Sequence, residues 1–541
     1  MKAAAGLGAA LLLALTYLLN LGSPYAPTNG DEMVYLHIAR LTSESGHWLP
    51  LVSDLQTPAG SEMRNTKPPL LFWQAMAAGQ WGWDLFTLRL PYVLETLLTA
   101  GLVGWLASQL IRVRPQLSHG LLAATLYLGF FATYRYGRPV LSSSIESLFL
   151  FGVCALAIIK LPSWKSCPIP LAMVSGLLMI PALLAKSFVL AAPVGLWLLT
   201  SLWILNDAKP SLQKFWQSAL PAATAVAIGV AGFALWFAID PDPSSVWREF
   251  IVGENFSTKF KDSSDSIAAI WLSPLLNAGW LAPLVLGLVV AAVQAFRHKA
   301  LQTSSEEKLL WLWVLAWLVV FSLPSQRSAR YVIPVMPAIA ALIALYADRI
   351  HRLWWLLTLG LIALATVALG WIAWCLDGVF AADAGYSTFY FVALAWLLVA
   401  CGVGFVQAKW MNNKLRACTA SSAVAWLALL GALAAPFDAP SNQYSAAIKA
   451  QLAGQKILVS QNFNAQSERF VFVLPGSKPM PYEASQGLPA SFKQGEPLAS
   501  ASRFVLRSRH AAGEVTWAAL SSKEGVRRLL VEREVLIGTK K

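Results

Sequence analysis

The feature that most constrains this chain is a series of apolar runs, most of them long enough to cross a lipid bilayer. A membrane-spanning helix needs about 20 mostly apolar residues, and we expect thirteen spans in the 541 residues. Charged residues make up only 13% of the chain, against about 25% in an average soluble domain. The sequence therefore predicts an all-α polytopic membrane protein and excludes a cytosolic enzyme, a disordered chain and a disulfide scaffold. The spans are expected near residues 4–22, 88–110, 118–134, 140–160, 168–185, 187–205, 216–239, 272–296, 309–323, 331–348, 353–376, 389–407 and 418–436.

Lysine and arginine are unevenly distributed between the segments that join these spans. If the N-terminus is cytoplasmic, the cytoplasmic segments carry 15 of these residues and the short outer loops carry 5. Because Lys and Arg favour the cytoplasmic side, we expect a cytoplasmic N-terminus and an outer C-terminus. An alternative is that residues 1–22 are a cleaved signal peptide, which would leave every other segment in place.

Three polar stretches interrupt the apolar pattern, and all three fall on the predicted outer side. They are a first loop at 23–87, a second long loop at 240–271 and a tail at 437–541, so residues 1–436 form the expected transmembrane domain. The tail contains short runs typical of strands and one typical of a helix, which predicts a small α/β domain. The strand-like runs are Lys456–Ser460, Arg469–Leu474, Arg503–Arg507 and Leu529–Ile537, and the helix-like run is Tyr444–Leu452.

The first loop contains two motifs that combine charge with a predicted helix start. Asp31 and Glu32 precede apolar residues at helical spacing, which predicts a helix along the membrane surface. The two acids either stabilise the helix by interacting with the positive end of its dipole or act in a functional site. Lys67 precedes two prolines, which suit the first turn of a second interfacial helix. It is either a lipid headgroup contact or a phosphate ligand.

Two later outer turns carry further charged groups. Glu146 lies inside the expected fourth span, and an acid at membrane depth marks a functional site by default; pairing with Arg138 is the structural alternative. Glu95 raises the same question and has Arg89 as a possible partner. The turn before the tenth span carries Arg327, Arg330 and Tyr331, which suit either phosphate binding or an interfacial belt.

As a set, these motifs resemble those of the C-type membrane glycosyltransferases that use polyprenyl-phosphate sugars. The set comprises the acid pair, Lys-Pro-Pro, Arg-Leu-Pro at Arg89–Pro91, the acid of the fourth span and the Arg-Tyr-x-x-Pro-x-x-Pro element at Arg330–Pro337. The resemblance is to bacterial lipid A aminoarabinose transferases, which are related to protein O-mannosyltransferases, and it covers essentially the whole chain. Lys186-Ser187-Phe188 and the element from Trp247 to Phe260 look like further family turns. The chain departs from the family at Val34, Thr66, Glu146 and Lys259.

The resemblance implies transfer of a sugar from a polyprenyl phosphate to an envelope acceptor such as lipid A, by inverting displacement, in the bacterial inner membrane with the tail in the periplasm. Fixed cations would hold the departing phosphate, and a carboxylate would position or deprotonate the acceptor. The expected catalytic residues are Asp31 and Glu146. The expected substrate-binding residues are Glu32, Tyr35, Lys67, Arg138, Lys259, Arg327, Arg330 and Tyr331.

Other classes of ligand and function have weaker support in the sequence. The six histidines are dispersed, so we expect no essential metal, while a divalent ion stays open. There is no phosphate-loop or dinucleotide motif, and we expect membrane lipids but no nucleic acid as partners. The main alternative function is a transporter or flippase for a phosphorylated lipid or solute. A structural assembly protein would leave the acid pair and Glu146 unexplained.

Overall fold

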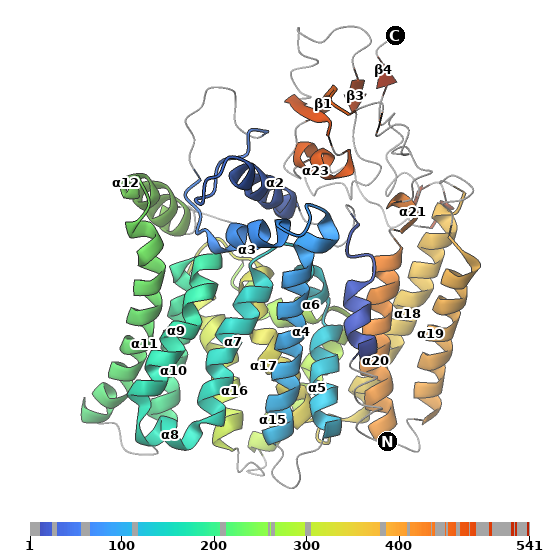
Figure 1. Cartoon of the computed structure of the whole chain (residues 1–541). Coiled ribbons are helices and arrows are strands. Elements are labelled where there is room, and N and C mark those ends of the chain that lie inside the picture. The colour runs from blue at the N-terminus through green and yellow to red at the C-terminus, as the bar shows by residue number, and fades with distance from the viewer. Residues whose placement is uncertain are drawn as a thin grey trace.

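Helices make up most of the protein. The computed structural model describes residues 11–23, 30–55, 65–110, 117–205, 212–257, 260, 266–297, 304–378, 386–407, 412–433, 435–438, 450, 453–460, 466–474, 476–482, 497–499, 521–523, 525–526 and 538–539. In Figure 1 the long helices run side by side, with α2, α3, α12 and α23 at one end of the bundle and α8 at the other. We call these two ends the α2 end and the α8 end.

The helices follow the apolar runs of the sequence. Residues 11–18 are helical. They are followed by α2 (Gly30–Glu44), α3 (Leu70–Gly79), α4 (Leu85–Leu110), α5 (Leu117–Gly129), α6 (Phe131–Tyr136), α7 (Ser143–Ile159), α8 (Leu161–Ser166), α9 (Pro168–Ala185), η1 (Phe188–Leu190), α10 (Ala191–Leu205), α11 (Leu212–Ala238), α12 (Pro243–Ser245) and the π-helix η2 (Val246–Ser257). The second half contains α13 (Ala268–Trp271), α14 (Ser273–Ala278), η3 (Gly279–Leu281), α15 (Ala282–Arg297), α16 (Ser305–Ser322), η4 (Ala329–Val335), α17 (Met336–Leu345), α18 (Arg352–Leu376), α19 (Thr388–Gln407), α20 (Asn412–Ala432), α21 (Ala435–Asp438) and α23 (Gln466–Val473).

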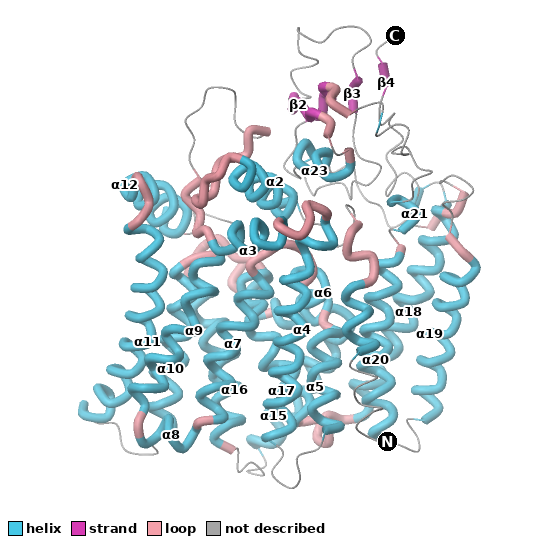
Figure 2. Tube along the Cα trace, in the orientation of Figure 1, coloured by secondary structure: helices cyan, strands magenta, loops and turns pink. Residues whose placement is uncertain are grey.

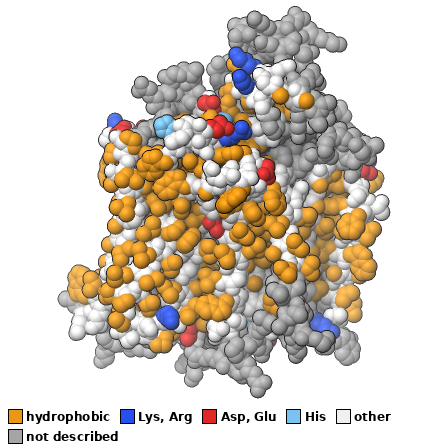
Figure 3. All heavy atoms as spheres, in the orientation of Figure 1, with side chains coloured by type: hydrophobic (Ala, Val, Ile, Leu, Met, Phe, Trp, Pro, Cys, Tyr) orange, Lys and Arg blue, Asp and Glu red, His pale blue; other side chains and the backbone are white. Residues whose placement is uncertain are grey.

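Seven helices within the described residues are long and apolar enough to cross a membrane. They are Leu85–Leu110, Pro168–Ala185, Phe215–Ala238, Ser273–Arg297, Arg352–Leu376, Thr388–Gln407 and Lys414–Ala432. The face of the molecule in Figure 3 carries a broad hydrophobic band, and its charged side chains lie mostly near the two edges of that band. This pattern is that of a multi-pass membrane protein. The chain also breaks at Lys186, between α9 and α10, as predicted.

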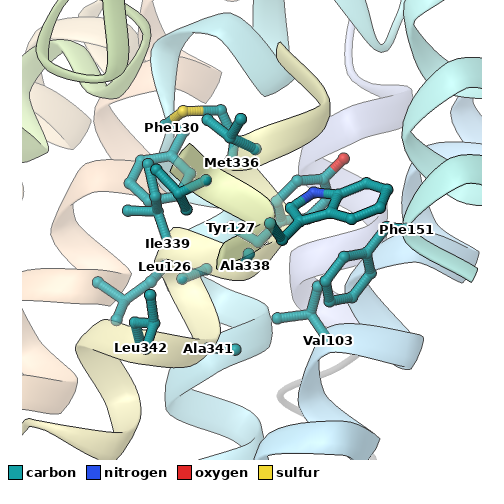
Figure 4. Close-up of a cluster of buried hydrophobic side chains, with 14 of the residues drawn as sticks. Val103, Leu126, Tyr127, Phe130, Phe151, Met336, Ala338, Ile339, Ala341 and Leu342 are labelled. Carbon is teal, nitrogen blue, oxygen red and sulfur yellow. The ribbon is translucent and has the colours of Figure 1, made fainter. Parts of the chain in front are cut away.

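The centre of the bundle is built around α17. Every residue from Met336 to Ala344 is buried, as expected of a helix that is apolar on all sides. Figure 4 shows its side chains packed among residues of α4, α5 and α7, including Val103, Tyr127 and Phe151. The short helix η4 leads into α17, so the core fixes the position of the turn that carries Arg330.

Close contact between α4 and α5 depends on two glycines. A Cβ atom placed on Gly104 would lie 2.8 Å from the carbonyl oxygen of Gly120, and one on Gly120 would lie 2.6 Å from the carbonyl oxygen of Gly104. Small residues allow membrane helices to approach this closely, which increases their van der Waals packing.

The two helices predicted in the first loop are present. Helix α2 begins at Gly30, directly before the acid pair, and α3 begins at Leu70, directly after the paired prolines. They pack on each other around a separate buried cluster that includes Met33, Leu36 and Phe72.

The tail contains a four-stranded sheet in the order β2-β1-β3-β4. Strand β1 (Lys456–Ser460) matches the predicted strand and pairs in parallel with β2 (Lys478–Tyr482) and β3 (Pro497–Ala499), and β4 (Gly538–Thr539) pairs antiparallel to β3. Figure 2 shows the strands together beyond α23. The runs at Arg503–Arg507 and Leu529–Ile537, and most of Tyr444–Leu452, lie outside the described residues.

The strand predicted at Arg469–Leu474 is wrong, because this segment belongs to helix α23. Its aromatic and β-branched residues favour a strand by propensity. In the fold, however, Phe470 and Leu474 are both buried and lie four residues apart, on one face of a helix. Helix α23 also contacts the first loop, since the Ser53 hydroxyl donates to Glu468 Oε1 at 3.0 Å.

Candidate active site

The two acids at the start of α2 have different environments. Glu32 is fully buried and forms a bidentate ion pair with Arg89, with distances of 2.7 and 2.9 Å. Its Oε1 also accepts the Val140 backbone N–H at 2.9 Å. Arg89 in turn donates to the carbonyl oxygens of Leu21 and Ser23, both at 2.6 Å. Glu32 therefore lies in a buried ion pair that fastens α2 to α4.

Arg138 has a similar fastening role. It is buried, its Nε donates to the Tyr17 carbonyl oxygen at 2.9 Å, and its Nη2 donates to the Leu19 carbonyl oxygen. Its guanidinium also lies 4.3 Å from the centre of the Tyr134 ring. Arg138 thus holds the end of the first apolar segment and does not pair with Glu146.

Glu95 is bound by neutral groups. Its two carboxylate oxygens accept hydrogen bonds from Gln74 at 2.7 Å and from Ser144 at 2.8 Å. Arg89, the possible partner of Glu95, is paired with Glu32 instead. Glu95 instead connects α3, α4 and α7 next to the turn that carries Glu146.

Asp31 faces the other way from Glu32 and meets a cation from a distant part of the chain. Arg330 Nη1 lies 3.1 Å from Asp31 Oδ2, and the Asp31 side chain is 43% exposed. The Arg330 guanidinium also lies 5.6 Å from the centre of the Tyr136 ring. This places an accessible carboxylate and a partly shielded guanidinium at the α2 end of the bundle.

Glu146 forms the second ion pair of this region. Its carboxylate is 1% exposed, and the Lys186 ammonium lies 3.0 Å from Oε1 and 3.2 Å from Oε2. The Lys186 side chain is 25% exposed and lies 5.6 Å from the centre of the Tyr331 ring. Tyr331 packs on Phe321 at 5.6 Å between ring centres. The buried acid thus holds a cation that is itself partly exposed.

Lys67 brings a third cation to the same region. Its ammonium lies 5.5 Å from the centre of the Tyr35 ring, and Tyr35 packs edge-on against Phe72 at 5.7 Å. The pKa of Lys67 is raised above its usual 10.5, most strongly by the Tyr35 phenol and less strongly by the carboxylates of Glu254 and Asp31. Partial burial acts in the opposite direction but does not outweigh them. Lys67 is therefore an ammonium at any physiological pH.

The second long loop packs against the turn that carries Lys186. The Ser187 hydroxyl donates to Asn255 Oδ1 at 2.8 Å, and Asn255 Nδ2 donates to the Phe250 carbonyl oxygen at 2.7 Å. Phe188 and Phe256 also lie 6.3 Å apart between ring centres. The predicted cation Lys259 lies outside the described residues.

Most of the predicted site residues converge, and two further groups join them. Asp31, Tyr35, Lys67, Glu146, Arg330 and Tyr331 gather with Lys186 and Tyr136. Arg327 lies in the turn between α16 and η4, where its Nη2 donates to the Ser322 carbonyl oxygen at 3.2 Å. Lys186 is not among the predicted site residues, although a single cation between two apolar runs of the sequence could have indicated it. Tyr136 had no signal beyond its position at an outer turn.

The cations of this group could hold an anionic ligand. Lys67, Lys186 and Arg330 gather beside the carboxylates of Asp31 and Glu146, and Glu254 of the second long loop also acts on Lys67. Among the residues that the structure describes, no three His, Cys, Asp or Glu side chains gather as metal ligands would. The arrangement can therefore bind a phosphate through charge-assisted hydrogen bonds.

Comparison with known proteins finds relatives of one kind. The chain is 28% identical over 356 residues to an undecaprenyl phosphate-alpha-4-amino-4-deoxy-L-arabinose arabinosyl transferase of Yersinia enterocolitica, which covers 64% of this chain and 60% of that protein. A Yersinia pestis protein of the same name is 27% identical over 344 residues, covering 62% of this chain and 58% of that protein. The matched region thus spans about 60% of the length of these curated relatives. No family model matches the chain.

The fold has been seen before in a solved structure. ArnT from Cupriavidus metallidurans bound to undecaprenyl phosphate superposes with a TM-score of 0.64 at 19% identity, over 89% of this chain and 86% of that one. The apo structure of the same protein gives a TM-score of 0.62. The resemblance to the lipid A aminoarabinose transferases that the motifs predict is confirmed by the sequence relatives, and the likeness of fold agrees with it.

Proposed function

We propose that the chain is a membrane glycosyltransferase that moves a sugar from a polyprenyl-phosphate donor to an acceptor in the cell envelope. The observation that carries this proposal is the convergence of Lys67, Lys186 and Arg330 beside the exposed carboxylate of Asp31. The curated relatives are named as transferases that use an undecaprenyl-phosphate sugar, and this favours a transferase over a transporter or flippase.

The three cations would bind the donor phosphate. When the bond between the anomeric carbon and the phosphate oxygen breaks, its electron pair stays with the phosphate, which gains negative charge. Fixed cations in a partly dry site stabilise that charge without reorganising. Lys186 and Arg330 suit this role because Glu146 and Asp31 already hold them in place. The Tyr331 hydroxyl would add a donor, and Arg327 and Lys259 would contribute further positive charge.

Asp31 would serve the acceptor. An incoming hydroxyl forms the new bond to the anomeric carbon from the face opposite the phosphate and loses its proton, which Asp31 accepts. In the structure Asp31 is paired with Arg330. A bound donor phosphate would compete for that guanidinium and leave the carboxylate available. With an ionised phosphate as acceptor, Asp31 would position it and take no proton. Either route inverts the anomeric centre.

Glu146 would act through Lys186. It is buried at 1% exposure, so it is out of reach of the acceptor and keeps the ammonium oriented towards the donor. We assign Glu32 and Arg138 to the support of this site, because their buried hydrogen bonds already use their carboxylate and guanidinium groups.

The setting of this activity would be the bacterial inner membrane. We propose thirteen membrane spans, with the shorter apolar helices and residues 11–18 completing the set. We also propose that the N-terminus is cytoplasmic, and that the α2 end and the 437–541 domain are periplasmic. The distribution of Lys and Arg supports this orientation. A reporter fused after residue 440 should then be active only as a periplasmic reporter, and cytoplasmic activity would put the proposed site on the wrong side.

The substrates would be identified by lipid extraction. Membrane lipids from cells with and without the gene would be compared by mass spectrometry. We expect a mass shift in lipid A or another envelope acceptor when the gene is present, and accumulation of a polyprenyl-phosphate sugar when it is absent. Identical lipid and glycan profiles from cells that supply the donor would contradict the proposal.

A further inference from the structure

A polar cavity lies far from the candidate active site, where α17 ends and α18 begins. It has a volume of about 730 Å³ and is lined by α15, by the turn at residues 348–351, by the first residues of α18 and by α20. The helical segment from Ala329 to Leu345 separates this turn from Arg330, a rise of about 25 Å. The cavity therefore belongs to the α8 end of the bundle.

This polar cavity is rich in positive charge. Its lining includes Arg349, Arg352 and Arg416, together with His351 and one acid, Asp348. Arg416 is nearly buried and its Nη1 donates to Asp348 Oδ1 at 2.6 Å. The side chains of Arg349 and Arg352 are exposed, and Arg349 lies over the Tyr346 ring at 5.2 Å. After the one acid is counted, an excess of positive charge faces the cavity.

Two apolar cavities adjoin the polar one. The first has a volume of about 670 Å³, shares Leu353 and Trp354 with the polar cavity, and continues along α18 to Leu364 beside Phe405 of α19. From Leu353 to Leu364 the helix rises about 16 Å, which is close to half of a hydrocarbon core of about 30 Å. This first apolar cavity forms a groove along α18 that is about as long as one leaflet of the bilayer is thick.

The second apolar cavity lies on the other side of Arg416. It has a volume of about 490 Å³ and is formed by residues 12–16, α5 and α20. Arg416 lines both this cavity and the polar one. His119 lies in its wall, and the buried Nδ1 atom of His119 has no hydrogen-bond partner among the described atoms. This histidine could bond an ester or phosphate oxygen.

We propose that the three cavities form one binding site for an anionic diacyl phospholipid, in the leaflet opposite the candidate active site. The arginines would hold the phosphate of the headgroup, and one acyl chain would occupy each apolar cavity. A free phosphate would leave both apolar cavities empty, and a polyprenyl phosphate, with a single tail, would leave one empty. Basic pockets between membrane helices are known to bind anionic headgroups.

The test measures lipid binding to the purified, delipidated full-length protein. Phosphatidylglycerol and phosphatidylcholine with the same acyl chains would be compared by native mass spectrometry and by thermal unfolding. We expect one tightly retained phosphatidylglycerol per chain and a higher Tm with phosphatidylglycerol than with phosphatidylcholine, because a ligand that binds only the folded state stabilises it.

Two variants separate headgroup binding from chain binding. Arg349→Gln combined with Arg352→Gln should weaken retention of phosphatidylglycerol at least tenfold. The matched control is Arg297→Gln, which removes an exposed charge at the end of α15 outside the cavities and should change retention less than twofold. Gly360→Leu fills the groove along α18, where a Cβ atom would meet only Phe405 at 3.5 Å. It should weaken binding of the diacyl lipid but not that of a short-chain phosphatidylglycerol.

Several results would overturn the proposal. They are equal retention of phosphatidylcholine, equal losses in the Arg297→Gln control, or equal stabilisation by inorganic phosphate alone. Displacement of phosphatidylglycerol by an equimolar amount of undecaprenyl phosphate would assign the cavities to a single-tailed lipid and would also refute it.

Discussion

Arg330 Nη1 lies 3.1 Å from Asp31 Oδ2, so residues 299 positions apart in the chain form one ion pair at the α2 end of the bundle. The pair joins the start of α2 to the turn that leads into the buried helix α17. The two adjacent acids differ in their access to a substrate, because Asp31 is 43% exposed while Glu32 is fully buried in its pair with Arg89.

Asp31→Asn should abolish most transfer and leave the protein folded. The substitution keeps the shape and removes the charge, and loss of a general base typically costs 10²–10⁴-fold in rate. The measurement is the rate of sugar transfer alongside Tm and donor binding. If Asp31 only interacts with the helix dipole, the variant would lose about 0.3–1 kcal/mol of stability and keep its transfer activity. That result would remove Asp31 from the catalytic step.

Glu32→Gln should reduce stability more than it affects the chemical step. The Glu32–Arg89 pair is fully buried, and breaking a buried pair on one side typically costs about 3–5 kcal/mol. The expected result is a large fall in Tm in detergent, with Asp31→Asn as the matched control at the neighbouring position. An unchanged Tm with transfer lost would return Glu32 to the substrate site.

Lys186→Met should lose donor affinity and stability together, and the two effects can be separated. It leaves the Glu146 carboxylate buried without its cation, which costs at least about 1–3 kcal/mol. Adding Glu146→Gln removes that unpaired charge, so the double variant should recover Tm but not donor affinity. Recovery of donor affinity in the double variant would show that Lys186 does not contact the phosphate.

Lys67→Ala should raise the donor KM or abolish turnover, while Lys67→Arg should retain part of the donor affinity. A lost charge-assisted contact costs on the order of 1.5–3 kcal/mol. The pKa of Lys67 is raised above 10.5, first by Tyr35, so the favoured ammonium form persists until the pH rises through that raised value. In the unsubstituted protein, Lys67 should therefore stay protonated between about pH 6 and 9, and its titration should not change the donor KM in that range. A donor KM that follows deprotonation of Lys67 in that range would contradict this environment.

Gly104→Ala should destabilise the contact between α4 and α5. Its Cβ would lie 2.8 Å from the Gly120 carbonyl oxygen, and overpacking of this kind typically costs about 1–3 kcal/mol. Gly101→Ala, on the same helix, is the control, because nothing lies within 4 Å of its Cβ. Thermal unfolding should show a lower Tm for Gly104→Ala only; equal values would mean that the helices can separate without cost.

The helices of the bundle and of the first loop could be predicted because local signals decide them. Runs of apolar residues mark the spans, and the paired prolines mark the start of α3 at Leu70. The strand β2 could not be predicted in the same way. It contains Pro479 and Pro481 and lies at the edge of the sheet, where proline is tolerated because one side of the strand needs no hydrogen bonds.

The candidate site could be predicted in its types of residue but not in its pairings. Charges at membrane depth identify Glu146, but nothing local indicates that its cation is Lys186 and not Arg138. Those partners are set by how the helices pack, and the pairs lie 40 and 299 residues apart. The same holds for Glu32, whose buried pair with Arg89 depends on contact between α2 and α4.

The burial of α17 also has a consequence for how the protein is made. The ten residues of α17 and the seven of η4 are fewer than the roughly 20 residues that a helix needs to insert into a bilayer alone. With residues 336–344 all buried, this segment gains its place only after the surrounding helices have inserted. We therefore expect Arg330 to reach Asp31 late in biogenesis, so that a nascent chain caught before that step lacks the Asp31–Arg330 ion pair.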